Sequence, residues 1–262
     1  MLFRKLNLDW RYGITELLIV VVGVLIALAA DGWLQRVQDR ALERDYVERL
    51  TRDLQLDTAE LGAIIVLTES RARFGETVLS AIDTGSRSGS ASDFLRAVEY
   101  ANYFSYPIYA KATIDDLSST GNLRLIRSTD VKDALSRYYV EIEWMQQFQE
   151  LFRPTQLALM RFLPEFMSLE HRYALLQEGI SAQCEGERGL SCIGIPWARQ
   201  ELVVSENEAD RTLERLRTRP EARALYANMA RIQGGHYANL AGINRAATGA
   251  LVVLQQYLED GW

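Results

Sequence analysis

Few residues of this chain have the types and spacing that chemistry requires, and the two cysteines come first. Cys184 and Cys192 lie in the stretch QCEGERGLSCIG, where a bond between them would close a short glycine-containing loop. A local disulfide of this kind persists in an oxidising compartment such as a periplasm. The sequence leaves two free thiols open as the alternative. We therefore treat the pair as a possible disulfide.

No other combination of side chains indicates a catalytic or metal site. His171 and His236 have no cysteine or histidine at metal-ligand spacing. Asp115 and Asp116 are adjacent, so on a helix they point about 100° apart and do not form a carboxylate pair. Phosphate-loop, dinucleotide and nucleophile-elbow motifs are absent from the sequence. We therefore expect no enzyme activity, no metal and no cofactor, and regard both histidines as structural or exposed residues.

The composition favours a folded, helical chain. The 262 residues include 48% hydrophobic and 24% charged residues but only five prolines, which suits long uninterrupted helices. The net charge of −6 argues against a nucleic-acid partner, because such proteins usually present a basic patch. No segment alternates apolar and polar residues long enough to predict a strand. The sequence therefore predicts an all-α fold, with a transmembrane helix that continues into a stalk and then a helical bundle.

An unbroken apolar run, Leu17–Ala30, is the strongest single feature. Fourteen residues span about 21 Å, which is short of the ~30 Å hydrocarbon core of a bilayer. The aromatic flanks extend the span from Tyr12 to Trp33, or about 33 Å. We therefore favour a membrane anchor over a cleaved signal peptide, for which Ala27-Leu28-Ala29 offers a cleavage site, and over a soluble core helix.

One face of this predicted membrane helix is suited to helix packing. On a helical wheel, this face spans about 80° and holds four small or apolar residues and one acidic residue. Gly23 and Ala27 form a small-xxx-small pair, which lets two helices approach closely in lipid. Glu16 either lies in that contact or extends into the headgroups. We predict self-association through a transmembrane packing face that comprises Glu16, Val20, Gly23, Ala27 and Ala30.

The chain divides at recognisable boundaries. We expect a cytoplasmic tail over 1–12, a transmembrane helix over 13–33, a stalk or first bundle helix over 34–83 and a linker over 84–92. A helical bundle over 93–262 would then lie in the periplasm of a bacterial inner membrane. Basic residues on both sides of the run leave the orientation open, and the cysteine pair favours export.

Residues that cap or interrupt helices predict where the later helices begin and end. We expect helices over about 93–104 with Ser92 as its cap, 110–120 ending at Gly121, and 206–218. Ser128 to Asp130 opens a long amphipathic helix, Pro220 starts another, and an Ala- and Gly-rich helix covers about 236–259. The predicted inner stripe of the long helix is Val131, Leu135, Tyr138, Ile142, Met145 and Phe152.

The segment YANYFSYPIYA concentrates aromatic residues around Pro107. Such side chains either form core between helices or line a partner or ligand surface. The candidate surface comprises Tyr100, Tyr103, Phe104, Tyr106 and Tyr109.

Two stretches, 13–57 and 111–139, resemble an uncharacterised family of bacterial single-pass membrane proteins, a domain of unknown function. Ile14-Thr15-Glu16 matches the family's start of the membrane helix, and Trp33 matches a tryptophan just beyond it. The run from Ser119 to Leu123 matches its serine-x-glycine-asparagine-leucine turn. Ala-Asp-Gly-Trp stands where the family usually closes the run with Asn-Asn-Trp-Asn. The resemblance implies an uncleaved anchor and a helical domain, and it implies no activity.

The turn motif also has a physical explanation. Ser118, Ser119 and Thr120 can bond the last carbonyls of a helix, while Gly121 takes a left-handed turn. Leu123, Leu125 and Ile126 would then enter a core.

Taken together, the sequence favours a membrane-anchored interaction or assembly module whose partners are the bilayer and a second copy of the chain, with another membrane protein as a further candidate partner. An extracytoplasmic ligand-binding sensor is the alternative, which a buried pocket with convergent polar groups would favour. A broad exposed apolar patch near 100–109 would favour the partner role.

Overall fold

The computed structural model of the chain describes residues 10–184 and 203–260, and the side-chain surroundings of 16–176 and 203–260. These residues form seven α-helices and one short 3-10 helix, with no strand among them. The predicted all-α class is confirmed.

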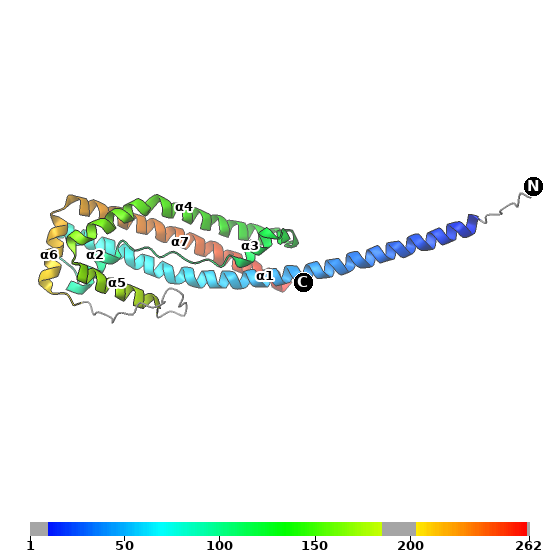
Figure 1. Ribbon diagram of the computed structural model, residues 1–262, viewed down its shortest axis with the longest axis horizontal. Coiled ribbons are helices and arrows are strands. Elements are labelled where there is room, and N and C mark those ends of the chain that lie inside the picture. The colour runs from blue at the N-terminus through cyan, green and yellow to red at the C-terminus, as the bar shows by residue number, and fades with distance from the viewer. Residues whose placement is uncertain (1–9, 185–202, 261–262) are drawn as a thin grey trace, which may run out of the picture.

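Helix α1, Trp10–Thr84, is continuous over 75 residues, or about 112 Å at 1.5 Å per residue. Its N-terminal half projects from the molecule, whereas its C-terminal half lies within the bundle (Figure 1). Glu43 is the first buried residue along it. No proline interrupts α1, so the projecting segment and the bundle share one helix axis.

The projecting half carries the apolar run. Large apolar side chains from Leu17 to Leu28 are 43–68% exposed. Within the described part of the chain, α1 is the helix long and apolar enough to cross a membrane, and none of its apolar window is buried against the rest of the chain. Exposed apolar surface of this extent needs lipid or another protein around it.

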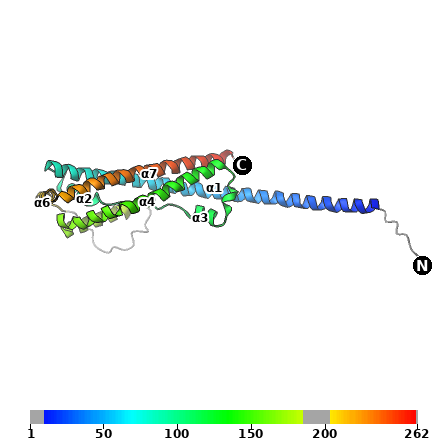
Figure 2. The same cartoon turned by 90° about the horizontal axis from the view of Figure 1, so that it is seen from above.

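The bundle is built from three long helices: the second half of α1, α4 (Thr129–Phe166) and α7 (Pro220–Asp260). Helix α7 runs antiparallel to the other two and packs along both (Figures 1 and 2). It extends from the predicted first-turn proline, Pro220, without a break through Gly234 and Gly235. A Cβ added at Gly235 would lie 3.2 Å from the Phe148 ring, so glycine permits the close approach of α4.

Short helices close the two ends of the bundle. Helices α2 (Ala91–Tyr100), α5 (Leu169–Cys184) and α6 (Glu206–Arg217) lie at the distal end, away from the projecting half of α1 (Figure 1). Helix α3 (Ala112–Ser119) and the 3-10 helix η1 (Asn122–Leu125) lie at the opposite, proximal end, where α1 leaves the bundle (Figure 1).

The cap of α2 differs from the prediction. Ser90 rather than Ser92 is the N-cap, because the Ser90 hydroxyl accepts the amide of Asp93 and the Asp93 carboxyl accepts the amide of Ser90. This reciprocal capping box satisfies two donors at the helix start, which Ser92 could not do.

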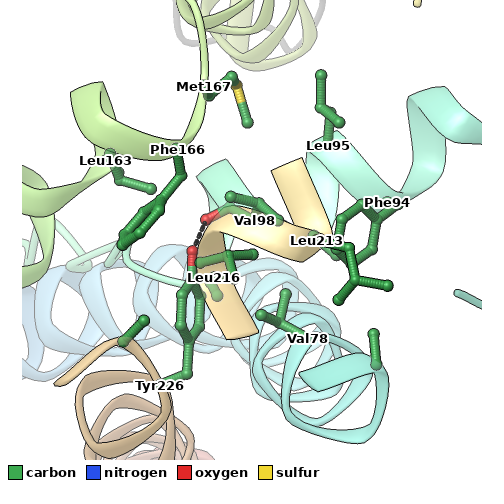
Figure 3. Packing of buried hydrophobic residues seen from close by; sticks show 14 of the residues in the cluster. Val78, Phe94, Leu95, Val98, Leu163, Phe166, Met167, Leu213, Leu216 and Tyr226 are labelled. Carbon is green, nitrogen blue, oxygen red and sulfur yellow. Dashed lines mark hydrogen bonds between the residues drawn. The ribbon is translucent and has the colours of Figure 1, made fainter. Parts of the chain in front are cut away.

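Two apolar cores occupy the bundle. The distal core joins the end of α1 to α2, α6, the end of α4 and the start of α7, as Figure 3 shows. Within it the hydroxyl of Tyr226 donates to the carbonyl of Val98 at 2.7 Å. The proximal core joins α1, α3, the start of α4 and the end of α7. Predicted stripe residues of α4 that are buried there are Val131, Leu135, Tyr138, Ile142 and Met145, whereas Phe152 is half-buried.

The turn after α3 follows the predicted chemistry. Ser118, Ser119 and Thr120 each donate a side-chain hydroxyl to a carbonyl of α3, at 2.7, 3.2 and 2.6 Å. Gly121 has φ +71°, the left-handed conformation that favours glycine. Ile126 is fully buried, but Leu123, which was expected in the core, is 41% exposed. The 3-10 turn of η1 directs Leu123 outward.

Replacing Gly121 by alanine should lower the free energy of unfolding by about 1 kcal/mol, because a Cβ is disfavoured at positive φ. Gly249→Ala is the matched control: this glycine is exposed within α7 with nothing within 4 Å, so alanine should stabilise by about 0.5–1 kcal/mol. Urea unfolding of the full chain in detergent measures both. Equal effects at the two positions would contradict the assigned conformation.

Candidate functional site

The predicted packing face lies on the projecting half of α1. Glu16, Val20, Gly23, Ala27 and Ala30 are all exposed on one continuous helix. A Cβ at Gly23 would have nothing within 4 Å, so no described segment of this chain occupies the position. The face is therefore open to lipid or to a partner.

The predicted cysteine pair falls at the edge of what the structure describes. Cys184 is the last residue of α5, while Cys192 and the side-chain surroundings of both lie outside the described residues. The disulfide stays a prediction.

The five candidate aromatics do not form one exposed patch. They are distributed along the end of α2 and the extended segment 101–111, which we call the strap (Figure 1). Tyr106 is 40% exposed, and the other four are half-buried. Tyr100 donates to the carbonyl of Leu175 at 2.6 Å, and Tyr109 packs edge-on against Tyr138. These residues mainly join the strap to neighbouring helices.

No strand lies beside the strap among the described residues, so side chains satisfy part of its backbone. Gln233 donates its amide to the carbonyls of Ala101 and Tyr103, at 3.3 and 2.8 Å. Gln156 donates to the carbonyl of Asn102 at 3.1 Å. A buried backbone carbonyl without a partner is costly. Amide side chains from α4 and α7 therefore hold the strap in place.

His236 completes this attachment. Its Nε2 lies 3.0 Å from the carbonyl oxygen of Ser105, so Nε2 carries the proton and donates. Phe104, Tyr106 and Phe148 place their rings around it, with centroids 5.3, 5.4 and 6.4 Å away. Burial lowers the pKa of His236 from 6.5 to about 4, with the charge of Arg71 assisting and the bond to Ser105 opposing. The imidazole is therefore neutral at pH 7.

A layer of polar side chains, the polar layer, separates the two apolar cores at the level of His236. It consists of Thr68 and Arg71 on α1 with Gln233 and His236 on α7. Arg71 donates to the Ser105 hydroxyl at 2.7 Å. The Thr68 hydroxyl, Gln233 Oε1 and His236 Nδ1 are buried with no hydrogen-bond partner among the described residues. Unpaired polar atoms on fully buried side chains are the feature of this bundle that packing alone does not explain.

Two buried carboxyl groups, those of Asp57 and Glu99, hold other junctions between helices. Asp57 accepts from the Tyr138 hydroxyl at 2.6 Å and from the amide of Ala110 at 2.8 Å. Glu99 pairs with Arg172 at 3.0 Å. Burial and the bond to Asp57 raise the pKa of Tyr138 far above its usual value. Within the described side chains, no group of His, Cys, Asp and Glu is arranged to hold a metal ion. The carboxyls therefore serve as structural anchors.

The two stretches that carry the family resemblance contact each other at the proximal end. Asn122 donates to the Tyr46 hydroxyl, which donates to Asp116, both at 3.1 Å. Glu43 is buried and accepts the amide of Arg127 at 2.6 Å and the hydroxyl of Tyr257 at 2.8 Å. The turn motif therefore positions the chain against α1 where that helix leaves the bundle.

The sequence prediction missed Asp57. It treated His236 as a structural or exposed residue, and the burial of His236 and its bond to Ser105 make it structural. A signal existed for Asp57, because it falls in the apolar spacing of Leu54 and Leu61, where an acid must find a partner. His236 had no comparable signal, since its partner Ser105 is 131 residues away in sequence. A second missed feature is an exposed apolar stripe on α4, formed by Val140, Trp144 and Leu151.

Comparison with known proteins adds no relative. No family model, curated protein or solved structure matches this chain. The class that the fold defines is a helical bundle with a projecting apolar helix that could span a membrane.

Proposed function

We propose that this protein is a membrane-anchored helical interaction or assembly module that self-associates through the projecting part of α1. The observation that carries the proposal is the continuity of α1, which joins an exposed apolar segment to the bundle core without a break. A rigid connection of this kind transmits the position of a membrane contact to the bundle.

Exposure supports an anchor over a soluble core helix, and the continuity of α1 supports it over a cleaved signal peptide. A core helix would bury its apolar window within the chain, and here none of that window is buried. The signal-peptide cleavage motif at Ala27–Ala29 lies within the first third of α1, where cleavage would divide one continuous helix. We place the anchor in a bacterial inner membrane, with the N-terminal tail in the cytoplasm and the bundle in the periplasm. The predicted Cys184–Cys192 bond supports that orientation.

The packing face is tested with Gly23→Ile combined with Glu16→Leu. A bulky side chain at Gly23 keeps the backbones apart, so the double variant should lower the particle mass in detergent to that of one chain. Val22→Ile is the matched control, because Val22 lies on another face of the same helix. Light scattering or analytical ultracentrifugation measures the mass. An unchanged mass in the double variant would show that the face is wrong.

Ligand sensing is the second candidate, and the polar layer favours it. Thr68, Gln233 and His236 carry buried polar atoms that have no hydrogen-bond partner among the described residues. A small polar ligand at this level of the bundle would supply the missing partners. Crosslinking in intact membranes followed by native mass analysis separates the two candidates. A measured mass that is a multiple of the mass of one chain supports assembly. A mass equal to one chain plus a bound small molecule supports sensing.

A further inference from the structure

We propose that the polar layer binds one small neutral molecule that donates hydrogen bonds, either a water molecule or an organic alcohol. The atoms that hold it are the Thr68 hydroxyl on α1 and, on α7, Gln233 Oε1 and His236 Nδ1. This site lies outside the membrane segment and needs no self-association, so it goes beyond the proposed assembly role. If the protein is a sensor instead, this is the class of molecule that it senses.

The three atoms come from neighbouring turns of two antiparallel helices. Gly75 on α1 lies against Ala230 on α7, since a Cβ added at Gly75 would be 3.2 Å from the Ala230 Cβ. Seven residues back along α1 and seven forward along α7, Thr68 is level with the residue after His236. Thr68 and His236 are therefore within about 1.5 Å of each other along the bundle axis. Gln233 is three residues before His236, a spacing that places both side chains on one side of α7.

Burial makes these atoms costly unless something binds them. The side chains of Thr68, Gln233 and His236 are each 0% exposed. A polar atom enclosed in this way loses its hydration and needs a hydrogen-bond partner in return. Enclosure between packed helices also limits the partner to a molecule of few atoms. Buried waters typically make about three hydrogen bonds, so three atoms at one level are enough to hold one such molecule.

The hydrogen bonds already present determine which groups the bound molecule must offer. Gln233 donates its amide hydrogens to two strap carbonyls, so its Oε1 can only accept. His236 donates from Nε2 to the carbonyl of Ser105, and its imidazole is neutral at pH 7, so Nδ1 also accepts. The molecule must therefore supply two donors, and the Thr68 hydroxyl can donate to it in return.

Arg71 determines the charge of the bound molecule. Its guanidinium is half-buried and donates to the hydroxyl of Ser105, the residue whose carbonyl binds His236. After burial, and against the bond to Ser105, the charge of Arg71 also lowers the pKa of His236, which places this charge beside the site. Arg71 would repel a cation, and an anion would face the lone pairs of two acceptors. A neutral hydroxyl compound meets neither obstacle.

The sign of one stability change tests whether the site is occupied. Thr68→Val keeps the shape of the side chain and removes the hydroxyl. If that hydroxyl binds a molecule, the variant loses a hydrogen bond and the folding equilibrium constant should fall about fivefold. If the hydroxyl has no partner, the variant removes an unpaired buried group and the constant should rise, which would overturn the proposal.

Urea unfolding of the full chain in detergent measures this sign. Thr248→Val is the matched control, because Thr248 is exposed within α7 and its hydroxyl donates to the carbonyl of Asn244 in the same helix. The control should stay within about twofold of the unaltered chain. A loss in Thr68→Val no larger than in the control would also overturn the proposal.

Nuclear magnetic resonance of the histidine rings identifies the bound molecule. The chain has two histidines, so isotope labelling of histidine gives two sets of ring signals, with His171 as the reference outside the polar layer. We expect the His236 Nδ1 signal upfield of that of an unbonded neutral ring. Magnetisation transfer from water to the carbon-bound proton beside Nδ1 indicates a bound water. A shift that saturates with added glycerol, but not with the larger sucrose, indicates an alcohol.

The remaining outcomes contradict the proposal. An unbonded Nδ1 signal would show that no donor reaches His236. A saturating response to ammonium chloride or sodium phosphate would overturn the neutral class, and a bonded signal with neither the water nor the glycerol response would overturn both named sources. These readouts do not depend on particle mass, so the Gly23 and Glu16 variants test self-association separately. Failure at His236 leaves the assembly role intact and removes the observation that favours sensing.

Discussion

Replacing Asp57 by alanine should lower the free energy of unfolding by about 3 kcal/mol, the largest effect we expect from one side chain. Asp57 is 2% exposed and accepts two hydrogen bonds that join α1 to α4 and to the strap. The substitution leaves the Tyr138 hydroxyl and the Ala110 amide without that acceptor. Both donors stay shielded from water, so the cost of desolvation is not recovered.

Urea unfolding of the full chain in detergent, followed by far-ultraviolet circular dichroism, measures this loss. Asp133→Ala is the control, because Asp133 is exposed on α4, and it should change stability by less than about 0.5 kcal/mol. Tyr138→Phe removes one donor and should cost about 1–1.5 kcal/mol. If Asp57→Ala were no more damaging than the control, Asp57 would not anchor the strap.

Lowering the pH should destabilise the bundle through His236. The pKa of His236 is about 4 in the folded chain against 6.5 for the free side chain. Between these values the unfolded chain binds more protons, so stability rises with pH. The contribution of neutral His236 to the free energy of unfolding is complete above about pH 6.5, and it is lost as the pH falls through about 4. Its full size is about 3 kcal/mol, at 1.36 kcal/mol per pKa unit.

The contribution is measured as a difference between variants, because carboxyl groups titrate in the same range. His236→Gln keeps a donor for the carbonyl of Ser105 and does not titrate. Its stability should fall less steeply than that of the unaltered chain from pH 6.5 to 4. Thr68→Val perturbs the same polar layer and should keep the steeper slope. Parallel curves for His236→Gln and the unaltered chain would contradict the role of His236.

The strap gives these two predictions a common consequence. Asp57 and His236 both bind its backbone, one near the proximal core and one between the cores. Loosening either contact should affect the junction of α1, α4 and α7 rather than one core alone. A ligand in the polar layer would act on the same junction.

Several elements could be predicted because their signals are local. The Ser128 cap accepts the amide of Val131 three residues on, and Gly121 takes the left-handed turn that ends α3. Pro220 begins α7 as its fixed φ allows. Each depends on residues within one helical turn, so the sequence alone is sufficient.

Other expectations failed or remained open for a different reason. Ser90 rather than Ser92 caps α2, because the reciprocal bond with Asp93 decides between two nearby serines. The five aromatics, expected as a single core or surface, are divided among several contacts along the strap. Leu123 is exposed because the 3-10 turn changes which side chains face inward.

The sequence by itself determined that this protein is helical and that its first helix carries an apolar segment long enough for a membrane, since periodicity and hydropathy are properties of neighbouring residues. Only the tertiary structure decided that α1 continues without a break from that segment into the bundle core. It also decided that Gln233 and His236 hold a strap some 130 residues earlier in the chain. Such contacts depend on which helices become neighbours, and that is set by packing of the whole chain rather than by local pattern.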